Sequence, residues 1–143
     1  MLAAPLLAGG ASGLVAVAAL AVAGVLRERG GWATALVAIA AFYVVFAIET
    51  GDRTTIVAQS GLATGFVVLA LVGARTTPWV LVAGLAGHGV FDLVLDLSQA
   101  DVAPDWWGPF CLGFDSVLGL ALAVLLMRGA FVSASPDAPG AVG

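Results

Sequence analysis

The feature that most constrains this chain is a series of five apolar runs, each close to the length of a membrane-spanning helix. A helix needs about 20 apolar residues to cross the hydrocarbon core of a bilayer. The runs are Leu6 to Leu26, Trp32 to Ile48, Thr55 to Ala74, Trp79 to Leu97 and Trp107 to Met127. Because the breaks between them are short, neighbouring helices must run antiparallel. The sequence predicts an all-α integral membrane bundle of five transmembrane helices.

The composition agrees with a lipid bilayer as the main partner of the chain. Of 143 residues, 62% are hydrophobic and 10% are charged, which is too little polar surface for a soluble domain. The five arginines are scattered and there is no lysine, so no nucleic acid is expected as a partner. Cys111 is the only cysteine, which excludes an internal disulfide. The richness in Ala, Gly, Val and Leu favours a multi-pass protein of the bacterial plasma (inner) membrane.

The domain organisation and orientation follow from the ends of the chain and from its arginines. Residues 1–132 are expected to form the five-helix transmembrane domain, with the first helix retained rather than cleaved as a signal peptide. Residues 133–143, rich in Pro, Ala, Gly and Ser, are expected to form a disordered cytoplasmic tail. Short loops that carry arginine tend to stay cytoplasmic. Arginines 27, 29, 75 and 128 fall on one side and Arg53 on the other, which predicts the N-terminus outside and the C-terminus inside.

Ionisable residues inside the fourth and fifth runs are the strongest indication of function. A charged side chain at the centre of a bilayer costs roughly 2.5 to 3.5 kcal/mol on insertion scales, so it needs a partner. His88 and Asp92 are four residues apart and share a helical face. At a rise of about 1.5 Å per residue, Asp115 on the next, antiparallel helix lies at the depth of His88. We therefore expect these three residues to converge near the outer face.

Further polar residues fall at the same end of the predicted bundle and are expected to line the pocket or exchange protons. They are Glu49, Asp96, Tyr43, Gln59 and Cys111. Each also has a simpler interpretation. Glu49 and Asp96 lie near helix ends, where water can solvate them. Cys111 fits a small buried core residue, and the other two fit hydrogen bonds to neighbouring backbone.

The pattern H-x-x-x-D on one helix, followed by P-x-C-x-x-x-D on the next, resembles small multi-pass bacterial membrane proteins of an uncharacterised family, a domain of unknown function. The resemblance covers residues 88 to 115 and, more loosely, Ala41 to Ala47. The family pattern has a second histidine near the position of Asp96, from which this chain departs. The resemblance therefore implies neither a multi-histidine metal site nor an activity.

Two function classes and a structural alternative remain open. Imidazole and carboxylate groups bind zinc and similar ions and also titrate. The pocket is thus expected to bind or conduct a proton, a divalent metal ion or a small polar solute, within a homo-oligomer or a larger membrane complex. The alternative is a membrane-embedded, metal-dependent hydrolase of a lipid-like substrate, with the metal on His88, Asp92 and Asp115. In a structural accessory subunit, the same residues would only clasp helices together.

Overall fold

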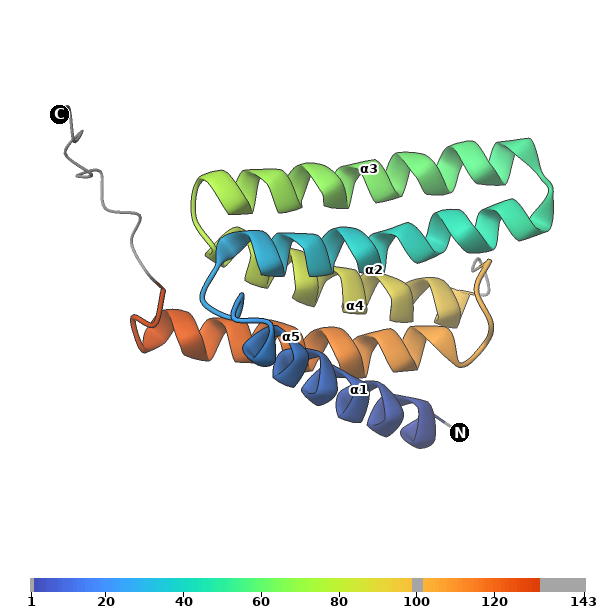
Figure 1. The fold of residues 1–143 in the computed structure, drawn as a ribbon. Helices are drawn as coiled ribbons and strands as arrows, with labels where there is room; N and C mark the ends of the chain where they lie inside the picture. Colours follow the sequence, from blue (N-terminus) through green and yellow to red (C-terminus); the bar gives the residue numbers. More distant parts are fainter. Residues whose placement is uncertain (1, 99–101, 132–143) are drawn as a thin grey trace, which may run out of the picture.

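A computed structural model describes residues 2–98 and 102–131, and within these ranges the chain forms five α-helices joined by short connections (Figure 1). The helices are α1 (Ala3–Val22), α2 (Arg29–Thr50), α3 (Arg53–Arg75), α4 (Trp79–Ser98) and α5 (Trp107–Met127). All five are long and apolar enough to cross a membrane. The predicted all-helical architecture with five candidate spans is confirmed. The predicted tail, residues 133–143, lies outside the described residues.

The predicted end of the first helix is wrong by four residues, because α1 ends at Val22 rather than at Leu26. Gly24 follows with φ of 76°, a backbone conformation that glycine adopts without a steric penalty. The amides of Gly24 and Val25 donate back to carbonyls of the last helical turn, which is the pattern of a Schellman cap. The residues after the cap are also apolar, so hydropathy does not fall at Val22 and does not indicate that the helix ends there. The other four helices match their predicted bounds to within three residues.

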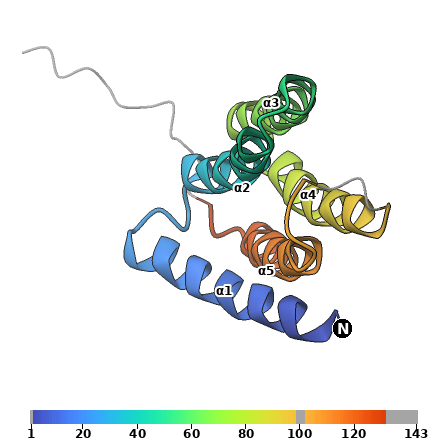
Figure 2. The same ribbon diagram turned by 90° about the vertical axis from the view of Figure 1, so that its right-hand side faces the viewer.

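The helices pack in two pairs with α1 at the edge. Helices α2 to α5 run roughly along one direction, whereas α1 crosses α5 obliquely (Figures 1 and 2). The main partner of α1 is α5, which also packs on α4, while α2 packs on α3. The α2–α3 turn and the α4–α5 connection lie at the same end of the bundle (Figure 1). We call this end, marked by residues 50–53 and 102–106, the polar end.

Direct backbone contact holds α1 against α5. The buried residues of α1 are Gly9 and Gly13. A Cβ atom at Gly9 would overlap the carbonyl oxygen of Phe110, and one at Gly113 of α5 would overlap the carbonyl oxygen of Leu6. Glycines on both helices therefore permit their close approach, as is common between membrane helices.

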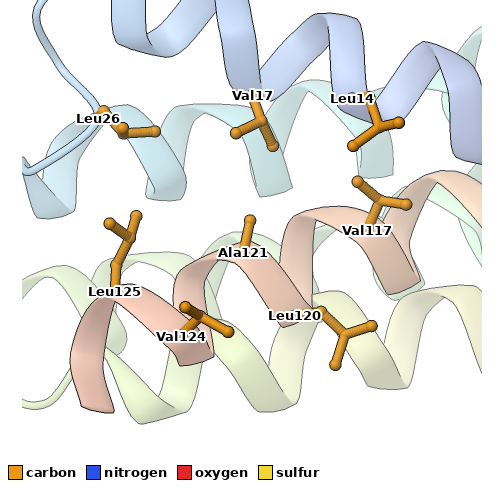
Figure 3. A pocket seen from close by; sticks show the side chains of 8 residues that line it. All are labelled: Leu14, Val17, Leu26, Val117, Leu120, Ala121, Val124 and Leu125. Atoms are coloured by element: carbon orange, nitrogen blue, oxygen red, sulfur yellow. The ribbon is translucent and has the colours of Figure 1, made fainter. Parts of the chain in front are cut away.

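Beyond this crossing the two helices diverge, and an apolar cavity of about 450 Å³ opens between them (Figure 3). Its lining comes from α1, the segment after it and α5. The lining residues are Leu14, Val17, Leu26, Val117, Leu120, Ala121, Val124 and Leu125. None of these side chains is polar, so the cavity offers hydrocarbon contacts alone.

The packed interior has two layers. The larger apolar core fills the half away from the polar end and contains Trp32, Leu36, Leu81, Leu85, Leu118 and Leu122. The indole Nε1 of Trp32 donates to the carbonyl of Leu26 at 2.9 Å, which satisfies this buried donor. A smaller cluster nearer the polar end contains Tyr43, Trp107 and Cys111. His88 follows Leu85 by about one turn and therefore lies between the two layers.

At the polar end, the side chain of Asp52 caps the N-terminus of α3. The Oδ2 atom of Asp52 accepts hydrogen bonds from the backbone amide and the hydroxyl of Thr55, each at 2.7 Å. The bond from the Thr55 hydroxyl is the main cause that lowers the pKa of the Asp52 carboxyl below its ordinary value of 3.8. Asp52 is exposed and therefore remains charged at neutral pH, which favours contact of this helix end with water.

Candidate metal centre

Three ionisable side chains meet inside the bundle, where α4 faces α5. His88 Nδ1 lies 3.0 Å from Asp115 Oδ2 and 3.3 Å from Asp92 Oδ2. One ligand atom from each of the three lies within 4.8 Å of the others. His88 is 1% exposed, and both aspartates are 0% exposed. The residues that were predicted to share one depth are therefore together in the structure, and we call them the His/Asp cluster.

Two glycines allow the helices that carry the cluster to approach closely. A Cβ atom at Gly89 of α4 would lie 3.1 Å from the Cβ atom of Asp115. A Cβ atom at Gly108 of α5 would lie 2.6 Å from the Cβ atom of Asp96 and 2.9 Å from the carbonyl oxygen of Asp92. A larger residue at either position would push α5 away from α4. The sequence did not single out these two among its 19 glycines.

Aromatic rings from two other helices pack on the imidazole. The ring centroid of Phe66, on α3, lies 4.6 Å from that of His88 at an interplanar angle of 68°. The ring of Tyr43, on α2, lies 6.2 Å away at 72°. Both contacts are edge-to-face, an arrangement that restricts rotation of the imidazole. The sequence analysis did not identify Phe66, because the position of an apolar residue in an apolar helix does not indicate which side chain it contacts.

Two of the predicted pocket residues border the cluster. The side chains of Tyr43 and Cys111 lie near the Asp92 carboxylate, whose two oxygens have no hydrogen-bond partner among the described residues. Both residues are buried, at 3% and 2% exposure. Donors on this side of Asp92 would orient its carboxylate toward His88, as outer-shell partners commonly do around metal ligands.

The other three predicted pocket residues are placed differently. Gln59 is buried, and its Oε1 atom has no hydrogen-bond partner within residues 2–98 and 102–131. Asp96 is partly buried near the end of α4, where its Cβ atom packs against Gly108. Glu49 is exposed at the end of α2. The structure therefore brings none of these three carboxylate or amide groups into the His/Asp cluster.

If its carboxylates are ionised, the cluster holds more negative than positive charge. It contains two carboxylates and one imidazole, while all five arginines lie at helix ends or between helices and the chain has no lysine. Unpaired carboxylates in an apolar interior are costly and must be neutralised by protons or by a cation. A divalent cation bound by two carboxylates and a neutral imidazole would leave the site without net charge.

The two distances from His88 Nδ1 to the carboxylate oxygens are also compatible with a shared metal ion. Nitrogen and oxygen ligands arranged tetrahedrally at about 2.0 to 2.1 Å from zinc lie about 3.3 to 3.4 Å apart. The separations of 3.0 and 3.3 Å from His88 Nδ1 are close to this value. In addition, Asp115 Oδ1 is buried and has no hydrogen-bond partner in the described part of the chain, so it can serve as a further ligand.

No protein-family model matches the chain, and comparisons with curated proteins and with solved structures find no significant match. The resemblance drawn from residues 88 to 115 therefore stays a prediction. The function has to be inferred from the chemistry of the cluster itself.

Proposed function

We propose that this chain is a membrane-embedded protein that binds one divalent cation, such as zinc, on His88, Asp92 and Asp115. The observation that carries the proposal is the convergence of three ligand atoms within 4.8 Å of one another, inside a membrane-type bundle. His88 supplies Nδ1 and the aspartates supply carboxylate oxygens, a donor set that zinc accepts readily. Tyr43 and Cys111 act from the outer shell by orienting Asp92.

A bound cation accounts for the cluster better than shared protons do. Protons shared between the imidazole and the carboxylates would also reduce the charge. They would leave Asp115 Oδ1 without a partner among the described residues, because the hydrogen bond of His88 goes to Oδ2. A cation can take both oxygens of one carboxylate. A buried polar atom without a partner costs about 1 to 3 kcal/mol, so this difference favours the cation.

Cation binding is also favoured over hydrolysis of a lipid-like substrate. A catalytic zinc site keeps one coordination position open for water and substrate, whereas a structural site is closed by protein groups. The exposure of 1% or less at all three cluster residues is that of a closed site. Hydrolysis would require an opening movement between α4 and α5, so it ranks second.

The proposal predicts one zinc ion per chain in protein purified in detergent, measured by elemental analysis and by calorimetric titration of metal-stripped protein with zinc chloride. Loss of an outer-shell partner of a metal commonly costs about 10- to 100-fold in affinity. Removal of a direct ligand should cost more. We expect His88→Ala and Asp115→Asn each to weaken zinc binding by more than about 100-fold.

Glu49→Gln is the matched control for this experiment. It removes a carboxylate from the same end of the bundle, but Glu49 is exposed and does not belong to the cluster. This variant should bind zinc with wild-type affinity. Circular dichroism verifies that each variant keeps its helices. Absence of saturable zinc binding by the wild-type protein, or equal binding by all variants, would contradict the proposal.

We further propose that the polar end faces the outside of the cell, supported by the arginine count of four against one. The test uses single cysteines at Thr54 and Thr76, exposed positions near opposite ends of α3. With a membrane-impermeant maleimide, Thr54→Cys should be labelled on intact cells and Thr76→Cys only after permeabilisation. The wild-type chain, whose Cys111 is 2% exposed, provides the unlabelled control. The reverse labelling pattern would establish the opposite orientation.

A further inference from the structure

The end of the bundle opposite the polar end carries four of the five arginines of the chain. They are Arg27 before α2, Arg29 at the start of α2, Arg75 at the end of α3 and Arg128 after α5. All four are exposed, and Glu28 is the one acidic side chain that the described residues place at this end. We call this end, on the left of Figure 1, the arginine end. Its positive charge favours a negatively charged partner.

The guanidinium groups of the arginine end are not neutralised by the chain itself. The ion pairs found in residues 2–98 and 102–131 all involve His88, so no arginine there is paired with a carboxylate. The chain also uses arginine alone as its basic residue, since it has no lysine. A guanidinium group is a planar fork of N–H donors that fits the oxygens of a phosphate two at a time. The arginine end is therefore chemically suited to a phosphate group.

A hydrogen bond between two helices fixes one of these arginines in place. The Nη1 atom of Arg29 donates to the carbonyl oxygen of Thr76 at 2.9 Å. Thr76 directly follows Arg75, so this bond brings the guanidinium of Arg29 to the chain segment that carries Arg75. A guanidinium group has five N–H donors, and this bond uses one of them. Two exposed arginines, one from α2 and one from α3, thus share a corner of the arginine end.

The surface of α3 next to this corner is apolar. Val68, Leu71 and Val72 precede Arg75 by one to two helical turns, at spacings that place them on its side of the helix. These three side chains are 43 to 52% exposed. Trp79 is 49% exposed at the start of α4, and such aromatic residues mark the level where lipid headgroups meet hydrocarbon. A phosphate group at Arg75 would therefore lie at headgroup level, with apolar side chains directly beneath it.

We propose that Arg29 and Arg75 together bind the phosphate of an anionic glycerophospholipid, whose acyl chains lie along the exposed face of α3. The two guanidinium groups favour a headgroup of net negative charge over a zwitterionic one, because a headgroup ammonium would be repelled by the second arginine. Free phosphate would gain nothing from the apolar face beneath Arg75. The site lies at the far end of the bundle from the polar end, and it does not depend on the proposed cation.

The test uses phosphatidylglycerol and phosphatidylcholine with identical acyl chains. Delipidated protein is incubated with an equimolar mixture, and the retained lipid is identified by native mass spectrometry. The attraction of one arginine to an anionic lipid surface corresponds to about fivefold in affinity. We expect the wild-type protein to prefer phosphatidylglycerol by about 25-fold, and either Arg29→Gln or Arg75→Gln to lower this preference to about fivefold. The double variant should retain the two lipids equally.

Arg75→Gln is the cleaner of the two variants, because it leaves the hydrogen bond from Arg29 to Thr76 intact. Arg128→Gln is the matched control. It removes an arginine from the same end, but Arg128 follows α5, which lies apart from α3 (Figure 2). This variant should keep the full preference, and circular dichroism verifies that every variant keeps its helices.

Three outcomes would overturn the proposal. Equal retention of the two lipids by the wild-type protein would show that no anionic lipid is selected. An equal loss of preference in Arg128→Gln and Arg75→Gln would show that the charge of the whole end acts without a site. Loss of the preference in excess sodium phosphate, but not in sodium chloride of the same ionic strength, would identify free phosphate as the ligand instead.

Discussion

Replacing Asp115 with alanine is expected to lower the free energy of unfolding by about 3 to 5 kcal/mol, the usual cost of breaking a buried ion pair from one side. The substitution removes the carboxylate that lies 3.0 Å from His88 Nδ1, and it leaves both His88 and Asp92 buried with fewer partners. The free energy is measured by reversible unfolding in mixed micelles at increasing denaturing detergent. A loss below about 1 kcal/mol would show that the carboxylate is not closely coupled to its neighbours.

Two further variants separate stability from metal binding. Glu49→Gln alters an exposed carboxylate and should change the free energy of unfolding by less than about 0.5 kcal/mol. The triple replacement of His88, Asp92 and Asp115 by leucine removes every member of the cluster together. Buried ionic groups replaced by apolar residues of similar volume often leave stability unchanged or raised. We therefore expect the triple variant to fold at least as stably as Asp115→Ala and to bind no zinc.

The second large effect concerns the crossing of α1 over α5. Gly113→Ala introduces a Cβ atom where the carbonyl oxygen of Leu6 lies, so the two helix backbones must separate. Overpacking of a close contact costs about 1 to 3 kcal/mol, and this is the expected loss in the free energy of unfolding. The same micelle assay measures it. A spin-label distance between α1 and α5 should increase at the same time.

Gly61→Ala is the control for this prediction, because a Cβ atom at Gly61 on α3 meets nothing within 4 Å. Alanine favours a helix over glycine by about 1 kcal/mol in water. The control is therefore expected to be neutral or slightly stabilising, opposite in sign to Gly113→Ala. If both substitutions change stability equally, the α1–α5 crossing is looser than its geometry indicates.

The bundle was predictable because it depends on the length of the apolar runs. The His/Asp cluster was predictable because it depends on the spacing of residues along two helices. Hydropathy over about 20 residues identifies a span. Counting residues along two antiparallel helices was enough to bring Asp115 to the level of His88. Glu49 shows the limit of that reasoning, since depth alone does not tell whether a residue at a helix end faces the interior or the surface.

The features that sequence reasoning missed depend on contacts between particular side chains and backbones. The end of α1 is determined by the positive φ of Gly24, which hydropathy does not register. The ring of Phe66 on His88 and the hydrogen bond from Arg29 to Thr76 require the packing of residues that are far apart in sequence. Gly89 and Gly108 acquire their role only from what lies opposite them.

The arrangement of α4 and α5 has a consequence for how the chain enters the membrane. All three residues of the His/Asp cluster lie on these two consecutive helices, which pack directly against each other. Inserted singly, each helix would expose its ionisable groups to hydrocarbon, at roughly 2.5 to 3.5 kcal/mol for each charged aspartate. Inserted as a preformed hairpin, the pair already encloses them. Biogenesis of this protein should therefore favour joint entry of its last two spans over stepwise integration.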